Sequence, residues 1–191
     1  MGFIMRGCRK SKALLLCCLV IILSGWDVCY AGGKFVKIKQ AQLSLIDNKA
    51  KLSILLDFKL SPEAEEALYS GIALFWDVSI ELKQKKRFWD KTLFAHTYRY
   101  SLTYYTLLDN FRVKDERKKT FRRFYSLSEA LAFMQHIETE EMPLSGYVAK
   151  QCVISVLNIS FDKEMLPAPL RPVAYFDSQW DLSTNEKRWC E

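Results

Sequence analysis

The chain has 191 residues, of which 50% are hydrophobic and 26% charged, a composition typical of a folded domain and not of a disordered chain. Its net charge is +6, but the first 31 residues carry +3 of it and the remaining 160 residues carry only +3. This small surplus argues against a strongly basic nucleic-acid-binding protein.

The first 31 residues have the three parts of a secretory signal peptide. A basic stretch that ends at Lys12 precedes an apolar run from Ala13 to Leu23, and Cys29-Tyr30-Ala31 places small residues at the two positions that signal peptidase inspects. As a helix, the apolar run would extend about 16 Å, well short of the roughly 30 Å hydrocarbon core of a bilayer. We therefore predict cleavage after Ala31 and a periplasmic protein whose residues 32–191 form a single β-rich domain. A retained membrane anchor is the alternative.

Only two of the six cysteines, Cys152 and Cys190, follow the predicted signal peptide. Neither belongs to a CxxC motif or has a histidine nearby, which argues against zinc ribbons, thioredoxin-like motifs and iron–sulfur ligation. In an oxidising compartment the two cysteines can form one disulfide, worth roughly 4 kcal/mol in the chain-entropy model. Two unrelated thiols are the alternative, because the sequence gives no Cα separation.

The N-terminal half of residues 32–191 alternates strands with one helix. Apolar residues at period two predict a hairpin over 40–60, with its turn at residues 47–49. Ser61-Pro62 favours the start of a short helix over about 62–70, which Gly71 ends. Period-two alternation then predicts strands over 72–82 and 92–105.

The C-terminal half predicts further strands and a second helix. Short strands are expected over 111–113 and 120–125, followed by a capping box that begins a helix over about 127–137. A long strand is expected over 147–161 and the last strand over 173–182, while the prolines between them exclude a central strand. The predicted fold class is mainly β, an antiparallel sheet or β-sandwich with two short α-helices, because the connections are too short for repeated parallel crossovers.

Several short signatures occur in a fixed order along the chain. They are Leu60-Ser61-Pro62, Gly71-Ile72-Ala73-Leu74, Arg87-Phe88-Trp89-Asp90, Tyr98-Arg99-Tyr100-Ser101-Leu102, Phe111-Arg112-Val113, Ser128-Glu129-Ala130-Leu131, Leu166-Pro167, Leu170-Arg171 and Trp180-Asp181-Leu182-Ser183, with Trp189. In this order the sequence resembles a family of proteobacterial envelope proteins, domain of unknown function 4390; Phe88 departs from it, standing where a tryptophan is expected. The resemblance implies an exported protein and brings no catalytic residues. It also implies a membrane sensor histidine kinase as a partner, because members are encoded near one.

The residues offer little support for catalysis or metal binding. His96 and His136 are the only histidines, and neither belongs to an HExxH or HxH motif. His96 is expected on a strand as a core or edge residue, and His136 near the end of the second helix. No GxSxG elbow and no glycine-rich phosphate loop is present. We predict no catalytic residue, no cofactor and no metal; a cell-wall hydrolase, which needs two carboxylates facing each other across a cleft, is the less favoured alternative.

Two segments that mix cations with aromatic rings are the better functional candidates. The candidate anion or partner surface consists of Lys85, Lys86, Arg87, Trp89, Lys118, Lys119, Arg122 and Arg123. Cations beside aromatic rings bind phosphates and stack on sugars, although basic hairpin ends also serve only to prevent edge-to-edge aggregation. The expected partners are an envelope protein or an anionic lipid or lipopolysaccharide surface, and not nucleic acid.

These observations together predict a non-catalytic periplasmic module that binds an envelope component, with modulation of a sensor kinase as one form of that activity. A carrier for a lipid or glycan is the alternative, and it requires a lined cavity between sheets.

Overall fold

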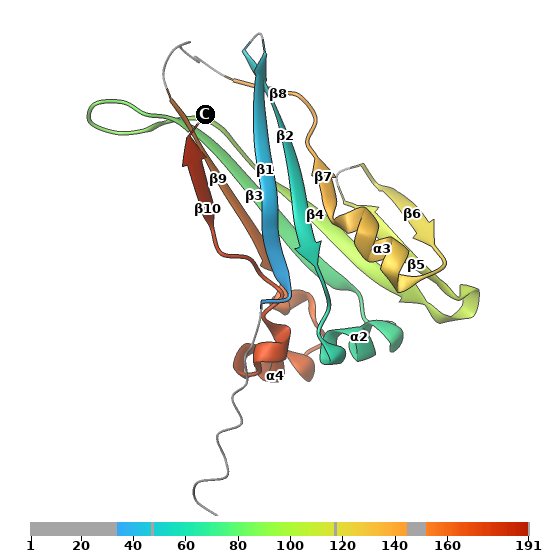
Figure 1. Ribbon diagram of the computed structural model, residues 1–191. Coiled ribbons are helices and arrows are strands. Elements are labelled where there is room, and N and C mark those ends of the chain that lie inside the picture. The colour runs from blue at the N-terminus through green and yellow to red at the C-terminus, as the bar shows by residue number, and fades with distance from the viewer. Residues whose placement is uncertain (1–33, 47, 117, 145–151, 191) are drawn as a thin grey trace, which may run out of the picture. The chain divides into compact units, whose positions relative to one another are not determined.

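Two antiparallel sheets face each other in the computed structural model, which describes residues 34–46, 48–116, 118–144 and 152–190 (Figure 1). The smaller sheet has the order β1 (Val36–Ile46), β2 (Lys49–Phe58), β7 (His136–Glu138), with β8 (Met142–Pro143) also paired to β2. The larger sheet has the order β10 (Lys187–Cys190), β9 (Val153–Phe161), β3 (Leu74–Gln84), β4 (Lys91–Tyr105), β5 (Asn110–Asp115), β6 (Thr120–Phe124). The mainly β, antiparallel fold class is thus confirmed.

The described residues all belong to one compact unit. The segment that we predict as a signal peptide lies outside them. Across residues 34–190, leaving out the short gaps given above, no helix has the length and apolar character needed to span a membrane.

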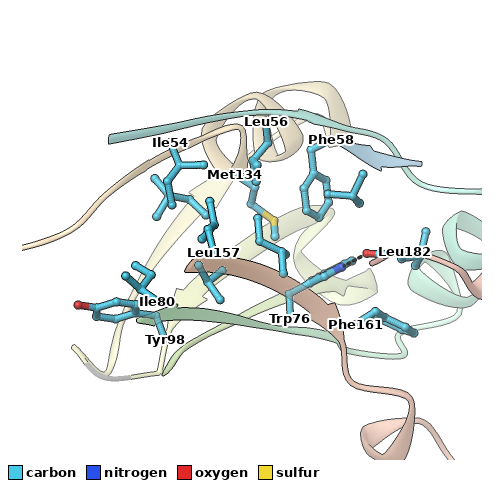
Figure 2. Close-up of a cluster of buried hydrophobic side chains, with 14 of the residues drawn as sticks. Ile54, Leu56, Phe58, Trp76, Ile80, Tyr98, Met134, Leu157, Phe161 and Leu182 are labelled. Carbon is cyan, nitrogen blue, oxygen red and sulfur yellow. Dashed lines mark hydrogen bonds between the residues drawn. The ribbon is translucent and has the colours of Figure 1, made fainter. Parts of the chain in front are cut away.

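The core lies between the sheets and follows from the period-two pattern of the central strands. Alternate residues of β2 and β3 are buried, as in the run Leu52, Ile54, Leu56 and Phe58 on β2. Figure 2 shows Ile54, Leu56 and Phe58 of β2 opposite Trp76, Ile80 and Leu157 of the larger sheet. Since one sheet face is apolar and the other polar, a slip of one residue would expose the whole apolar set, and this fixes the register.

Three short helices cover parts of the sheets: α2 (Pro62–Tyr69), α3 (Leu127–Met134) and α4 (Leu170–Phe176). The Ser61 hydroxyl accepts a hydrogen bond from the backbone N–H of Ala64 at 3.1 Å, and the Ser126 hydroxyl accepts one from Glu129 at 3.2 Å. Both caps are those predicted from the sequence. Gly71 follows α2 with φ +84°, a conformation that residues with a Cβ rarely adopt.

The second helix is shorter than the predicted 127–137. It ends at Met134, and His136 to Glu138 form β7, so His136 is a strand residue that pairs with Leu55. The backbone N–H of Leu56 donates to the carbonyl of Gln135 at 2.8 Å, and Ile137 is buried opposite Ile54. Pairing with β2 and burial of one isoleucine therefore outweigh another turn of helix.

The predicted last strand over 173–182 is wrong, and so is the prediction of only two helices. The segment forms α4 and a 3-10 turn, Ser178–Trp180, and the last strand is β10, farther along the chain. The Asp177 carboxylate accepts a hydrogen bond from the backbone N–H of Gln179 at 2.9 Å, which begins the 3-10 turn. Period two misleads here because Val173 and Tyr175 are both at least half exposed and pack into no sheet.

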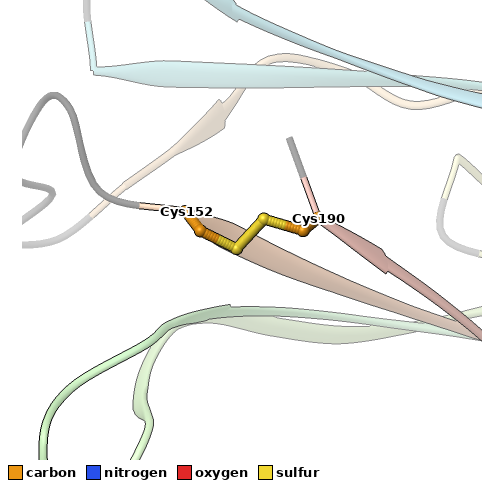
Figure 3. Close-up of a disulfide and its surroundings, with 2 residues drawn as sticks. All are labelled: Cys152 and Cys190. Carbon is orange, nitrogen blue, oxygen red and sulfur yellow. A yellow bond between two sulfur atoms is a disulfide. The ribbon is translucent and has the colours of Figure 1, made fainter.

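The chain between α4 and β10 supports the edge of β9. The Ser183 hydroxyl accepts a hydrogen bond from the backbone N–H of Phe161 at 3.0 Å, and the Thr184 hydroxyl accepts one from Ile159 at 3.1 Å. The backbone then pairs as β10, and Cys190 forms a disulfide with Cys152, with a Cα separation of 5.8 Å (Figure 3). The expected long strand over 147–161 is a strand from Val153 onward; its residues 147–151 lie outside the described part of the chain.

Candidate functional site

A cavity of about 490 Å³ lies between the sheets on the side of α3. Ten of its sixteen lining residues are apolar or aromatic, and they come from both sheets and from α3. They are Leu56, Phe58, Trp76, Val78, Tyr100, Val113, Phe133, Met134, Ile137 and Ile159. The helix α3 contributes Phe133 and Met134 to these walls.

Polar and charged residues surround the mouth of the cavity. They are Asp115, Lys118, Thr120, Arg122, His136 and Glu138. Two of these charges pair with residues outside the cavity: Lys118 with Glu140 at 3.0 Å, and Glu138 with Lys51 at 3.0 Å. Arg122 is different, because within the described ranges its guanidinium has no carboxylate partner and lies 5.0 Å from the ring centre of Phe133.

The ionisable residues at the mouth do not form a recognisable catalytic pair. The ring nitrogen Nδ1 of His136 contacts the backbone carbonyl of Ala132 at 3.5 Å, and Glu138 is directed to Lys51. A general base needs an oriented partner within hydrogen-bond reach. His136 has no such carboxylate partner among the described residues. Across the same part of the chain, no group of His, Cys, Asp and Glu has a metal-binding arrangement.

The second basic segment is divided between two faces of β6. Because side chains alternate along a strand, Arg122 lies at the cavity while Arg123 lies on the outer face of the sheet. On that outer face the guanidinium of Arg123 is 5.3 Å from the Phe121 ring centre, and that of Arg112 is 3.7 Å from the ring centre of Tyr105. Arg123 therefore belongs to a stack of cations and rings on the outer face. Lys119, another cation of this segment, lies in the turn that precedes β6, with φ +50°.

The first basic segment forms the tip of the β3–β4 hairpin. Residues 85–90 are all exposed, with exposed fractions of 81% for Phe88 and 76% for Trp89. The two rings are neighbours, 6.3 Å apart between centres, and the Arg87 guanidinium lies 5.7 Å from the Phe88 ring centre. We name residues 85–90 the hairpin tip.

The structure does not bring the two basic segments together. The turn between β5 and β6 lies beside Arg99 and Tyr100, whereas the hairpin tip lies beyond Lys91, at the start of the same strand. The nine residue-to-residue steps along β4 from Lys91 to Tyr100 span about 30 Å at 3.3 Å per residue. This exceeds the Debye length of about 8 Å at physiological salt several times, so the two segments act electrostatically as separate surfaces.

The outer face of the larger sheet also carries a charged cluster, which has a structural explanation. The Arg99 guanidinium donates two hydrogen bonds to the Asp77 carboxylate at 2.7 Å each and one to Asp162 at 2.8 Å. Donation of these hydrogen bonds to Asp77 is the main cause of a raised pKa of Arg99, which remains a cation. This cluster joins β3, β4 and the end of β9, and we assign it no ligand.

The chain is matched to a protein family over nearly all of the described part. The family model of "Domain of unknown function (DUF4390)" matches residues 34–190. The chain belongs to this family. Comparison with curated proteins and with solved structures gave no match.

Most signatures of the DUF4390 resemblance have structural roles in this chain. Ser61 caps α2, and the backbone carbonyl of Leu182 accepts a hydrogen bond from the Trp76 indole at 3.2 Å. Arg171 donates to the carbonyl of Leu166 at 2.8 Å. The signature Arg87-Phe88-Trp89-Asp90 differs from these, because its aromatic side chains are exposed and pack against no core residue.

The residues that form the walls of the cavity were not predicted from the sequence, but Arg122 at its mouth was named as a candidate binding residue. Phe133 and Met134 belong to the helix predicted from its capping box, and nothing local distinguishes them from ordinary core residues. On β6, by contrast, period two separates Arg122 from Arg123, although both were predicted to lie on one surface. His96, expected at the core or edge, is exposed on β4.

Proposed function

We propose that this DUF4390 domain is a non-catalytic binding protein that holds an amphiphilic anion in the cavity between its sheets. The apolar part of the ligand lies against Val78, Val113 and Met134, and its acidic group lies at Arg122. One observation carries the proposal: an apolar cavity opens at an arginine that, among the described residues, has no carboxylate partner. Of the two binding functions considered from the sequence, this favours the ligand carrier.

The size and lining of the cavity support a small-molecule ligand. Ligand sites in proteins measure about 300–1,000 Å³ and combine apolar walls with a few polar groups that orient the ligand. Burying an apolar chain there supplies affinity at about 25 cal/mol per Å². Arginine supplies selectivity, because its planar guanidinium forms two parallel hydrogen bonds with a carboxylate or phosphate.

The proposal leaves the other functional expectations as predictions. No contact in the structure tests three of them: export to the periplasm, the absence of catalysis and contact with a sensor kinase. A ligand-loaded carrier is compatible with a kinase partner, since the cavity uses the α3 side of the fold and leaves the outer face of the larger sheet free for a protein.

Binding is tested with cis-parinaric acid, a fatty acid whose fluorescence rises in an apolar site, added to the purified protein. We expect saturable binding with one site, and Arg122→Glu should weaken it on the order of tenfold because it replaces attraction by repulsion at the mouth. The matched control is Arg123→Glu, the same change on the next residue and the opposite face, which should leave binding unchanged.

A second variant acts on the walls. Met134→Trp places a larger side chain in the cavity and should abolish binding while the far-UV circular dichroism spectrum stays that of a folded β protein. Binding that is equally weakened by both arginine variants, or unaffected by either of them and by Met134→Trp, would refute the cavity as the site.

A further inference from the structure

The hairpin tip combines exposed aromatic rings with a surplus of cations. The stretch from Lys85 to Lys91 holds four cations and only one carboxylate, Asp90. The cations are Lys85, Lys86, Arg87 and the adjoining Lys91, and every residue of the stretch is exposed. Phe88 and Trp89 are the two aromatic residues of this stretch, and each exposes more than three quarters of its surface. Exposing two neighbouring rings to water is unfavourable, so the arrangement indicates a surface that is covered in the bound state.

The base of the hairpin is held in place on both strands. Gln84 is fully buried, and β3 pairs there with Lys91 of β4 and with Val153 of β9. The backbone N–H of Lys85 donates to the carbonyl of Cys152, whose side chain forms the disulfide with Cys190 (Figure 3). The tip therefore projects beyond a part of the sheet that is joined covalently to β10, and the backbone at its base need not be ordered anew on binding.

The shape and charge of the tip fit a lipid surface. The tip is a convex turn of six residues, so a protein partner would need a hollow of matching shape, whereas the headgroup region of a bilayer needs none. Tryptophan favours that region because its ring is apolar and its indole N–H is polar. Cations beside the ring attract anionic headgroups, and each cation near the surface raises the affinity by about fivefold.

We infer that the hairpin tip docks this protein on an anionic lipid bilayer, with Phe88 and Trp89 entering the headgroup region and Lys85, Lys86 and Arg87 contacting acidic headgroups. Seven residues of β3 separate Lys85 from Val78 at the cavity, a distance of about 23 Å. The docked protein therefore keeps its cavity clear of the headgroups, and the inference does not depend on the cavity having a ligand.

The test is co-sedimentation of the purified protein with vesicles. Binding is expected to vesicles of equal parts phosphatidylglycerol and phosphatidylcholine, and not to phosphatidylcholine alone. It should fall steeply towards about 1 M salt, where the Debye length is about 3 Å. Reversing Lys85, Lys86 and Arg87 to glutamate should weaken binding by more than about a hundredfold, because three attractions at about fivefold each are lost and repulsion is added, and Phe88→Ala with Trp89→Ala should weaken it as well.

Two matched controls separate the hairpin tip from other exposed groups. Leu107→Ser with Leu108→Ser removes exposed apolar residues from the β4–β5 connection, where Leu107 is 99% exposed, and should leave vesicle binding unchanged. Lys119→Glu with Arg123→Glu reverses two cations of the second basic segment that do not line the cavity, and it should also have no effect. Equal losses in these controls would overturn the assignment to the hairpin tip.

Depth of insertion provides an independent readout. Trp89 is the most exposed of the described tryptophans, because Trp76 and Trp180 are buried and Trp189 is partly buried. Brominated lipids should quench the fluorescence of the wild type, and Trp89→Phe should bind the vesicles but lose the quenching. Failure to bind anionic vesicles at low salt, together with a protein crosslink from position 89 in intact envelopes, would refute the lipid surface in favour of a protein partner.

Discussion

The space between the two sheets is filled in one region and open in another, although the same strands form both. Towards α2 and α4, the Trp76 ring lies 5.0 Å from that of Phe58 and 5.3 Å from that of Phe161, and Phe161 stacks on Trp180 at 6.0 Å. Towards α3 and β6, the space remains a cavity of about 490 Å³. We call these the packed region and the open region.

The difference lies in what covers the strands and not in the strands themselves. In the packed region, Trp180 and Leu182 of the C-terminal segment are buried in the core. The backbone carbonyl of Leu182 accepts a hydrogen bond from the Trp76 indole N–H (Figure 2). In the open region the cover is α3, a helix of eight residues whose Phe133 remains 37% exposed. A short helix that is not packed to full density leaves room that a ligand can occupy.

The largest loss of stability is expected from removing Trp76, which lines the cavity of the open region and packs against Phe58 and Phe161 in the packed region. Trp76→Ala should lower the free energy of unfolding by about 3–5 kcal/mol, because it removes a buried ring and leaves a cavity in the packed region. Urea unfolding followed by far-UV circular dichroism measures this. Phe133→Ala, in the open region, is the control and should cost less than about 1 kcal/mol; equal costs would contradict the distinction between the regions.

Removing the disulfide is expected to have the next largest effect. Cys152→Ser with Cys190→Ser should lower the free energy of unfolding by about 2–4 kcal/mol, since the unfolded chain is then no longer constrained. The same urea titration applies, with the reduced wild type for comparison. Fatty-acid binding by the folded double variant should be unchanged, because the disulfide lies at the far end of β9 from the cavity. Loss of binding in the folded state would show that the open region depends on the disulfide.

Enlarging a buried side chain should have different effects in the two regions. Ala174→Leu adds volume at a fully buried position of α4 and should cost about 1–3 kcal/mol through overpacking. Val113→Leu adds one methylene at the wall of the cavity and should leave stability unchanged or raise it by up to about 0.8 kcal/mol. Thermal unfolding of both variants compares them directly, and similar losses would mean that the cavity is not available to an added methylene.

The smallest effect is expected at a surface ion pair that belongs to neither region. Lys49 donates a hydrogen bond to Glu141 at 2.7 Å and thereby lowers the pKa of Glu141 below its usual 4.5. The stabilisation is present above that usual pKa and is lost as the pH falls through the lowered pKa of the folded state. Glu141→Gln should therefore be slightly less stable than the wild type at neutral pH and equal to it in strong acid. A difference that persists in acid would assign the effect to something other than the charge.

The sequence predicted the elements whose signals are local. The hairpin of β1 and β2, the serine cap of α2 and the strands β3 to β6 follow from period-two alternation and from capping residues, and the structure confirms them. The errors lie at β7 and α4, where the chain departs from its local preference. At β7, pairing with β2 buries Ile137; at α4, a helix replaces the predicted strand and buries Ala174, while Val173 and Tyr175 are at least half exposed.

The candidate site divides in the same way. The exposed cations and rings of the hairpin tip were named from the sequence, because their composition alone marks them. The cavity was anticipated only as a requirement for a carrier, since its walls come from strands and a helix that are far apart in the chain.

By itself the sequence determined the mainly β antiparallel fold, the family, and the surplus of cations in two segments. Only the tertiary structure decided that these segments are separate, that Arg122 and Arg123 lie on opposite faces of one strand, and that a cavity remains beneath α3. The physical reason is that side-chain alternation and capping act over a few residues, whereas the distance between two surfaces and the filling of a core depend on contacts between segments up to a hundred residues apart.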